Sequence, residues 1–493
     1  MPNKKKLEVL FVGAELAPFV KVGGLGDVMG SLPKGLVKQG VNIKMILPFY
    51  GAIDTKKYKS KLVKKNINLD IDDKQVKFDL YQTLLPGTKI SVFLVKHKMF
   101  NGKDIYVGGR KYMKGRVYSR SVSDIERFVF FSKAVAETIR TMKWKLDVVH
   151  AHDWHSAILP TFIDEYSLED KNFANIKTLF TIHNLANQGI SGLDIVDYGG
   201  LHQKLTPALM EDYYDKDGDK IDMMKIGILS ADFVNTVSPN YAKEILTKEY
   251  GEKLETYLLR RQKHLSGIVN GIDIDFFDPS KDKLIYKKYN AKNRKVNKAF
   301  NKQALQKEMK LPQDDVPVFG LVSRLVNQKG LDILVPVLDK ILAKNDVQVV
   351  ILGTGQPEHE QAFKQLAKKY PEKLSANITF NITMAQKIYA GSDFFLMPSL
   401  FEPCGLGQMI AMRYGTLPLV RATGGLKDTV KHGVTGVVFK KYTQVATKKA
   451  FEQAIRIYKN KPKFNKMIST AMHQDFSWDK SAKDYIKLYK KLA

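Results

Sequence analysis

The stretch Val318-Phe-Gly-Leu-Val-Ser-Arg-Leu-Val-Asn-Gln-Lys-Gly330 joins a short apolar run to a polar turn that ends in glycine. Residues 318–322 are typical of a buried β-strand, and a helix-like apolar pattern follows over residues 331–342. Strand, turn and helix in this order form the repeating unit of a parallel sheet covered by helices. Arg324 and Lys329 would therefore follow the carboxyl end of a strand, where α/β folds bind their ligands.

The same alternation continues on both sides of this stretch. Short apolar runs predict strands at residues 9–12, 43–47, 90–95, 147–150, 178–182, 347–352, 394–397 and 417–420. Longer patterns predict helices at residues 125–142, 359–370 and 408–414. The pattern restarts after about residue 265. We therefore expect an α/β protein with two Rossmann-like domains, whose parallel sheets face a central cleft.

The expected domains are residues 1–264 and residues 265–472, because glycines punctuate the segment 265–273 between them. Residues 473–493 form a separate C-terminal segment. One helical face of that segment is apolar and carries Ala482, Tyr485, Ile486, Tyr489 and Leu492. Such a stripe needs a surface to cover, so we expect the last helix to pack on the body of the protein.

The composition is that of a folded protein, with 493 residues, 44% of them hydrophobic and 26% charged. A chain of this length can bury large cores without covalent cross-links. Cys404 is the single cysteine. This count excludes an intramolecular disulfide and a cysteine-based metal site, and it favours a cytoplasmic protein.

The formal net charge is +28, from 79 basic and 51 acidic residues. Such a balance favours a polyanion partner, either nucleic acid or an acidic membrane. However, only 12 of the 79 basic residues are arginine, the side chain best suited to base and phosphate recognition. We interpret the excess as lysine on solvated faces, including the basic segment 281–310, and expect neither nucleic acid nor a membrane as a partner. Nucleic-acid binding stays open as the alternative from another class.

No targeting or membrane-spanning segment is expected. Glu8 and Glu15 flank the apolar residues 9–14, and this run is shorter than the ~7–15 apolar residues of a signal peptide. No apolar stretch reaches the ~18 residues of a membrane span.

Glycine-rich turns follow strands in both halves and mark places for phosphate. Lys21-Val-Gly-Gly-Leu-Gly-Asp27 opens a helix, so the backbone N–H groups around Gly23 and Gly24 and the Lys21 ammonium would face an anion. A tight strand–helix turn without a ligand is the alternative, because Met29 stands where a G-x-G-x-x-G pattern needs its third glycine. Gly353-Thr354-Gly355 is a similar turn in the second half.

Charged residues occupy two further turns of the second half. Arg324 and Lys329 are two fixed cations, which suit a pyrophosphate leaving group. Glu402 lies in Ser399-Leu-Phe-Glu-Pro-Cys-Gly-Leu-Gly407, between a strand and a helix. It is either a helix cap or an acceptor for sugar hydroxyl groups.

Two histidine-bearing segments end strands of the first half, His150-Ala-His-Asp-Trp-His155 and Thr181-Ile-His-Asn184. Their spacing matches no zinc pattern, and no cysteine is near. We therefore expect no metal here, and interpret these residues as the polar lining of a cleft.

Eight segments resemble the family of bacterial glycogen synthases and plant starch synthases, and they occur in the order of that family. They are Lys21-Val-Gly-Gly-Leu25, the two histidine segments, Val237-Ser-Pro-Asn-Tyr-Ala242, Asn270-Gly-Ile-Asp273, the Ser323-Arg-Leu to Gln-Lys-Gly330 turn, Glu402-Pro-Cys-Gly-Leu406 and Arg421-Ala-Thr-Gly-Gly-Leu426. A match of eight segments in order, over residues 21 to 426, is not expected by chance.

The resemblance implies a GT-B fold, in which the C-terminal helix crosses back to the N-terminal domain. It implies retaining transfer of glucose from ADP-glucose to the non-reducing end of an α-1,4-glucan such as glycogen, without a cofactor or metal. A GT-B transferase that uses a UDP-sugar stays open as an alternative. A transferase of the E-x₇-E type is disfavoured, because Ile410 stands eight residues after Glu402.

The resemblance also implies roles for individual residues. Arg324 and Lys329 would stabilise the departing pyrophosphate, Glu402 would hold the donor glucose, and Lys21 would contact the donor phosphates. Further donor-binding positions would be Gly23, Gly24, Gly353, Thr354, Gly355, Cys404, Gly405 and Leu406. The reacting centre and the acceptor side would be lined by Asp153, His183, Asn184 and Tyr106.

The sequence departs from the family pattern at two places near these residues. Gly407 stands where the family commonly has threonine, which removes a hydroxyl near the donor phosphates. Ser123 and Asp124 replace a usual Asp-Asn pair before Arg127, on the acceptor side.

Overall fold

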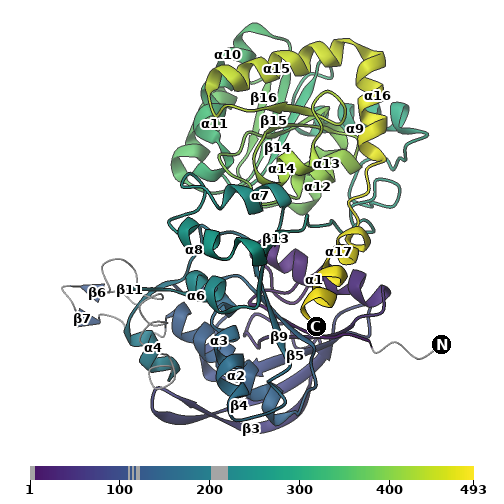
Figure 1. The fold of residues 1–493 in the computed structure, drawn as a ribbon. Coiled ribbons are helices and arrows are strands. Elements are labelled where there is room, and N and C mark those ends of the chain that lie inside the picture. The colour runs from purple at the N-terminus through teal and green to yellow at the C-terminus, as the bar shows by residue number, and fades with distance from the viewer. Residues whose placement is uncertain (1–5, 109–111, 114–115, 118–122, 201–219) are drawn as a thin grey trace. The chain divides into compact units, whose positions relative to one another are not determined.

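The computed structural model describes residues 6–108, 112–113, 116–117, 123–200 and 220–493. The chain forms two compact units (Figure 1). The first comprises Met1–Val237, Ala242–Ile268 and Trp478–Ala493, and the second comprises Ser238–Tyr241 and Val269–Ser477. The chain thus leaves the first unit after Ile268 and returns to it at Trp478.

The sheet of the first unit has nine strands among the described residues. Their order is β13 (Leu265–Gly267), β12 (Phe233–Thr236), β9 (Lys177–Ile182), β8 (Val148–His152), β1 (Glu8–Val12), β2 (Asn42–Pro48), β5 (Ser91–Lys96), β4 (Lys74–Leu84) and β3 (Lys61–Ile71). Neighbours from β13 to β5 are parallel, and β4 and β3 add an antiparallel hairpin at one edge. Two small antiparallel pairs join β6 (Tyr112–Met113) to β7 (Arg116–Val117), and β10 (Ile190–Gly192) to β11 (Lys220–Asp222).

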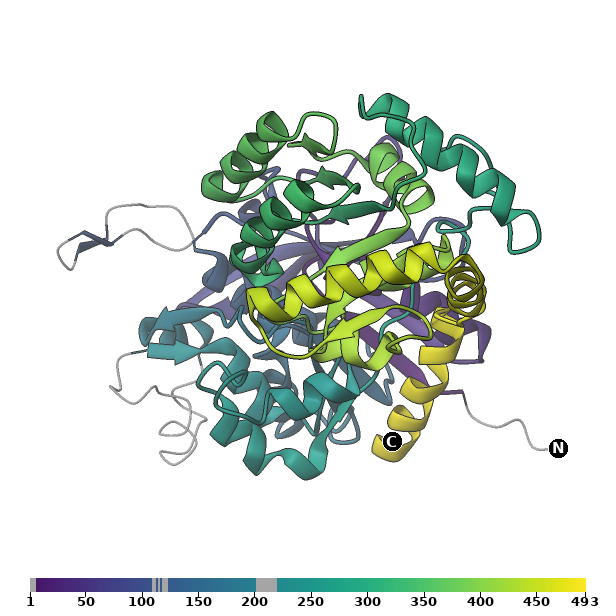
Figure 2. The ribbon, with the colours of Figure 1, turned by 90° about the horizontal axis from the view of Figure 1, so that it is seen from above.

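The sheet of the second unit has six described strands, all parallel to their neighbours. Their order is β16 (Leu374–Asn377), β15 (Gln348–Leu352), β14 (Val318–Val322), β17 (Phe394–Met397), β18 (Leu417–Arg421) and β19 (Val437–Phe439). Helix α15 (Gln444–Lys459), yellow-green in Figure 2, lies across this sheet. Its apolar face joins the strands in one buried core.

Helices complete both units. Those of the first unit are α1 (Gly24–Lys38), α2 (Asp124–Thr141), α3 (Leu159–Ser167), α4 (Asp194–Gly199), α6 (Met223–Ser230), α8 (Glu255–Arg260) and α17 (Trp478–Leu492), with the short 3₁₀ turns η1 (Lys98–Phe100), η2 (Trp154–Ser156) and η3 (Gln262–His264). Helix α7 (Pro239–Glu244) lies where the chain passes between units. Those of the second unit are α9 (Arg294–Glu308), α10 (Leu331–Lys344), α11 (Pro357–Lys369), α12 (Ile382–Gly391), α13 (Gly407–Arg413), α14 (Gly424–Thr429), α15 and α16 (Lys461–Met472), with η4 (Asn327–Lys329). Among the described helices, none combines the length and apolar composition that a bilayer crossing requires.

The predicted α/β class is confirmed, since both units contain a largely parallel sheet with helices. Every strand predicted from an apolar run is present to within two residues at each end. The hairpin of β3 and β4 was not predicted, because Lys64, Lys65 and Asn66 interrupt its apolar pattern and most of its first half is exposed.

The last helix packs on the first unit, as its apolar stripe predicts. Ala482, Tyr485 and Tyr489 of α17 are fully buried. The Tyr489 hydroxyl lies 2.8 Å from His150 Nδ1, and the Tyr485 hydroxyl accepts a hydrogen bond from Asn235 Nδ2 at 3.1 Å. The return of the C-terminal helix to the N-terminal part of the chain is therefore confirmed.

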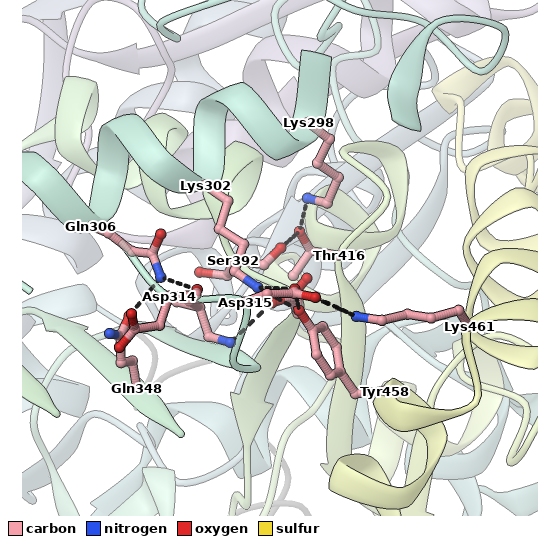
Figure 3. A network of polar contacts seen from close by, with 12 residues as sticks. Lys298, Lys302, Gln306, Asp314, Asp315, Gln348, Ser392, Thr416, Tyr458 and Lys461 are labelled. Carbon is pink, nitrogen blue, oxygen red and sulfur yellow. Dashed lines mark hydrogen bonds and ion pairs between the residues drawn. The ribbon is translucent and has the colours of Figure 1, made fainter. Parts of the chain in front are cut away.

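The basic segment 281–310 is not simply a solvated face. Helix α9 buries Arg294 in the second unit, and it also buries Lys298 and Lys302, which Figure 3 shows. Lys302 Nζ lies 2.9 Å from Asp393 Oδ2, and Lys298 Nζ donates to Thr416 Oγ1 at 2.7 Å. The expectation of a solvated segment is thus wrong for these three side chains. Lys302 and Lys298 attach α9 to residues that directly precede β17 and β18, and Arg294 donates to Asn465 Oδ1 of α16 at 3.0 Å.

Candidate active site

The order of the strands reverses at β1 in the first unit and at β14 in the second. β1 lies between β8 and β2, and β14 lies between β15 and β17. Open α/β sheets bind ligands beyond the carboxyl ends of strands at such a reversal, because the flanking loops diverge there. The loops that follow β1, β8, β14 and β17 carry Lys21, Asp153, Lys329 and Glu402. Four predicted site residues therefore lie at the two positions where this fold class binds ligands.

Lys329 and Glu402 form an ion pair at the reversal in the second unit. Lys329 Nζ lies 2.6 Å from Glu402 Oε2, and Ser399 Oγ donates to the same oxygen at 3.1 Å. The two side chains are 18% and 7% exposed, so solvent screens the pair only weakly. The loop thus presents a fixed ammonium beside a fixed carboxylate, which suits an anionic group attached to a sugar.

Two glycines permit this arrangement. Gly330 has a φ of 71°, and a Cβ atom there would overlap the carbonyl oxygen of Pro398. Gly424 has a φ of 44°, and a Cβ atom there would overlap the carbonyl oxygen of Glu402. Only glycine lets both turns approach the loop that carries Glu402 so closely.

Arg324 is exposed on a loop that packs against the turn Gly353-Thr354-Gly355. Leu325 N donates to Thr354 O at 2.8 Å, and a Cβ atom at either glycine would overlap the backbone of residues 323–325. The Gly353 N–H donates to Asn377 O at 3.1 Å, and the Gly355 N–H donates to Glu360 Oε1 at 2.9 Å. These glycines therefore have a packing reason, and both N–H groups are already used within the protein.

Cys404, Gly405 and Leu406 form the turn before α13. Burial raises the pKa of the Cys404 thiol to about 12, so the thiol stays protonated near neutral pH. Gly405 has a φ of 73°. Gly407 follows, and a Cβ atom there would lie 2.9 Å from Cε1 of the buried Phe395 ring. The departure from threonine at position 407 therefore has a packing reason.

The glycine turn of the first unit is held by Glu15, whose side chain is buried. Glu15 Oε2 accepts hydrogen bonds from the N–H groups of Val22 and Gly23, each at 2.8 Å. Lys21 Nζ pairs with Asp27 Oδ1 at 2.6 Å and is half exposed. Two N–H groups of the turn thus face a carboxylate of the protein. The groups that remain to bind an anion are the Lys21 ammonium and the N–H groups in the first turn of α1, which begins at Gly24.

Tyr106 contacts the same carboxylate, because its hydroxyl donates to Glu15 Oε1 at 2.7 Å. Burial, and then the charge of Glu15, raise the pKa of the Tyr106 phenol. The backbone after Tyr106 is fixed by Asp124, which accepts the Gly108 N–H at 2.7 Å and pairs with Arg127 at 2.9 Å. The departure at position 124 therefore still supplies a complete anchor for this loop.

Asp153 fixes the loop that follows β9. Asp153 Oδ1 accepts the N–H of His183 at 2.7 Å and that of Asn184 at 3.4 Å. Its backbone φ is 55°, a conformation that residues other than glycine adopt rarely and mostly at functional sites. Burial raises the pKa of Asp153 to about 7; the two N–H groups oppose this rise, and Glu15 adds to it.

His183, His152 and His150 form a row, in which His150 and His152 are fully buried and His183 is partly exposed. His152 Nδ1 lies 3.0 Å from His183 Nε2, and the rings of His150 and His152 are 4.0 Å apart. Burial lowers the pKa of each ring, that of His183 to about 3, so the row is neutral near pH 7. Among the described residues, no group of three histidine, cysteine or acidic side chains is arranged to hold a metal ion.

Glu15 and Ser399 were not predicted as site residues from the sequence. Glu15 is a charged residue three positions after a buried strand that lies at the strand reversal, and this position is the signal that could have identified it. Ser399 gives no comparable signal, because its contact depends on the folded loop.

Known proteins resemble the chain along nearly its whole length. A family model described as the starch synthase catalytic domain matches residues 8–260, and a model of glycosyl transferases group 1 matches residues 302–474. The chain is 43% identical to the glycogen synthase of Fervidobacterium nodosum, over 98% of this chain and 99% of the relative. It is 44% identical to the glycogen synthase of Kosmotoga olearia, over 98% of each chain.

A solved structure supports the same conclusion. The catalytic domain of starch synthase IV from Arabidopsis thaliana, bound to ADP and acarbose, is 31% identical to this chain. The TM-score is 0.86 over 99% of each chain, which confirms the predicted GT-B fold class.

Proposed function

The chain belongs to the family of bacterial glycogen synthases and plant starch synthases, and on that premise we propose that it transfers glucose from ADP-glucose to the non-reducing end of an α-1,4-glucan with retention of the α configuration. Family membership makes the protein a glycosyltransferase with a nucleotide-sugar donor and a glucan acceptor. ADP-glucose is the proposed donor because the related starch synthase IV was solved with ADP bound. We place the reaction in the cytoplasm, in keeping with the single cysteine.

The observation that carries this proposal is the pair of Lys329 and Glu402 beyond neighbouring strands of one sheet. Lys329, with Arg324, would stabilise the negative charge that develops on the departing diphosphate. Glu402 would accept hydrogen bonds from hydroxyl groups of the donor glucose. Gly405 and Leu406 would bring backbone close to the phosphates, while Thr354 is the member of its turn that remains for the donor.

The proposed chemistry proceeds on one face of the glucose ring. The acceptor hydroxyl oxygen forms a bond to C1 on the face that the diphosphate leaves. The bond from C1 to the diphosphate oxygen breaks, and that oxygen keeps the electron pair and takes the proton of the hydroxyl. Such a reaction needs positioning and charge stabilisation more than a protein nucleophile.

A covalent intermediate on Glu402 is the alternative mechanism. Glu402 Oε2 is already engaged by Lys329 and Ser399, which reduces its electron density as a nucleophile. This geometry favours the reaction without a covalent intermediate.

The residues of the first unit would act on the donor phosphates and on the acceptor. Lys21, three residues before α1, would contact the phosphates together with the first turn of α1, which begins at Gly24. The acceptor side and the reacting centre would be lined by Asp153, His183, Asn184 and Tyr106. A neutral His183 suits this role, because a cationic ring would repel a developing positive charge at C1.

Linkage analysis of the product tests the proposal. Glycogen labelled by the protein with [¹⁴C]glucose should release its label as maltose on β-amylase digestion, since that enzyme removes maltose units from α-1,4-linked non-reducing ends. Label that resists this digestion would contradict either the linkage or the end of the chain that is extended.

A further inference from the structure

We propose that Glu15 is a positioning residue for glucose transfer, a buried carboxylate that fixes the donor-side glycine turn and the acceptor-side Tyr106 relative to each other. This inference rests on the proposed function. Glu15 lies in the loop after β1, at the strand reversal of the first unit. It contacts two predicted site segments and is itself neither a predicted donor ligand nor a predicted acceptor ligand.

Both oxygens of the Glu15 carboxylate are used, and they serve different segments. Oε2 accepts the N–H groups of Val22 and Gly23 at 2.8 Å each, and Oε1 accepts the Tyr106 hydroxyl at 2.7 Å. The side chain is 3% exposed, so water does not compete for these contacts. Hydrogen bonds to a charged acceptor in such surroundings are stronger than neutral ones, and they hold their partners in a narrow geometry.

The glycine turn closes tightly around this carboxylate. A Cβ atom at Gly26 would lie 3.2 Å from Glu15 Oε2 and 3.1 Å from Cγ of Lys21. A residue larger than glycine at position 26 would therefore crowd both Glu15 and Lys21. Because Lys21 directly precedes Val22, the two hydrogen bonds to Glu15 fix the backbone from which the Lys21 side chain extends.

The acceptor side is coupled to Glu15 by contact and by charge. The Tyr106 ring lies 5.3 Å from the His155 ring, which belongs to the segment that carries Asp153. The negative charge of Glu15 raises the pKa of Asp153, and the charge of Asp153 adds to the rise in the pKa of Tyr106. His183 and Asn184 oppose the rise through their N–H groups. Neutralising Glu15 would thus loosen Tyr106 and lower the pKa of Asp153.

A second buried carboxylate–tyrosine pair in the same unit provides a matched control. Glu137 is 5% exposed and accepts the Tyr166 hydroxyl at 3.1 Å, at the other end of α2 from Asp124. Glu137 contacts none of the predicted site residues in the described part of the chain. Glu15→Gln and Glu137→Gln make the same chemical change at two buried carboxylates that each accept a tyrosine hydroxyl, and Glu137 also pairs with Arg140 at 2.6 Å.

The test compares both variants with the wild type in glucose transfer to glycogen over pH 5.5 to 9, with melting temperatures measured in parallel. Glu15→Gln should lower kcat/KM about 10²-fold, the scale of a small misplacement of reacting groups. The acid limb of its pH profile should move to lower pH. Glu137→Gln should stay within about 3-fold of the wild type in kcat/KM, and its pH profile should not shift. This should hold even if its melting temperature falls as much as that of Glu15→Gln.

Tyr106→Phe and the double variant complete the experiment. If Glu15 acts through Tyr106, the two losses are less than additive, with a coupling of at least about 5-fold. Equal effects of Glu15→Gln and Glu137→Gln on rate and pH profile, in an active wild type, would overturn the positioning role alone. An inactive wild type would overturn the proposed function instead.

Discussion

Lys329 Nζ lies 2.6 Å from Glu402 Oε2 although 73 residues separate the two in the chain. Parallel strands β14 and β17 are neighbours, so the loops that follow them meet at one edge of the sheet. The pair therefore results from the strand order. Gly330 and Gly424 allow the neighbouring turns to pack closely against the loop that carries Glu402.

Loss of the Lys329 ammonium should lower turnover. Lys329→Ala is expected to reduce kcat about 10²-fold, the scale for one preorganised charge contact in a transition state. Lys369→Ala is the control, because Lys369 pairs with Asp339 at a similar 2.7 Å but is 58% exposed. Initial rates of glucose transfer by the two variants and the wild type measure the difference in turnover. Near-normal turnover in Lys329→Ala would refute its assignment.

Gly330 should be irreplaceable for steric reasons rather than for its backbone angle alone. Gly330 and Gly433 share a φ of 71°, but only Gly330 has a carbonyl oxygen in the place of a Cβ atom. Gly433→Ala should cost about 1 kcal/mol, as for a single left-handed residue. Gly330→Ala should cost about 2 kcal/mol more through overpacking. Equal shifts of the melting temperature in the two variants would show that no steric conflict exists.

Restoring the common family residue at position 407 should not improve the enzyme. In Gly407→Thr the new Cβ atom meets the buried Phe395 ring at 2.9 Å, so the ring or α13 must move. We expect a loss of stability of about 1 to 3 kcal/mol and no gain in turnover. Thermal melting and transfer rates measure both effects. A stable Gly407→Thr variant with faster turnover would contradict this prediction and show that a hydroxyl at position 407 helps the reaction.

Protonation of Asp153 should appear in the pH dependence of stability. Its pKa is about 7 in the folded protein, well above the ordinary value. Between about pH 4 and pH 7 the folded protein therefore binds more protons than the unfolded chain, and stability falls as the pH rises. Asp153→Asn lacks this titration, so relative to the wild type it should gain about 3 kcal/mol between pH 5 and pH 8. Urea unfolding at both pH values measures the difference, and a difference that does not change with pH would contradict a buried, protonated Asp153.

Local sequence pattern predicted much of this fold. Apolar runs located nine of the parallel strands but not β12, β13, β16 and β19, which are short. The turns after two of the predicted strands carry Lys329 and Glu402, which the structure brings together. The antiparallel hairpin of β3 and β4 was not predicted, because an edge hairpin with an exposed face has no continuous apolar run. The burial of Lys298 and Lys302 of α9 was not predicted either, since their partners Thr416 and Asp393 lie about a hundred residues away in the sequence.

Glu15 illustrates the same limit at the site. In the sequence it is an acidic residue that interrupts an apolar segment. Its importance depends on Tyr106, which is 91 residues away, and on two backbone N–H groups whose direction only the folded turn defines. Contacts of this kind require the strand order before they can be inferred.

Glucose incorporation into glycogen from ADP-[¹⁴C]glucose and from UDP-[¹⁴C]glucose, measured in parallel with the same protein, tests the proposed function most directly. We predict incorporation from ADP-glucose, with a much higher kcat/KM than from UDP-glucose, and its loss in Lys329→Ala. Preferential transfer from UDP-glucose would contradict the proposed donor, and incorporation from neither donor would contradict the function itself.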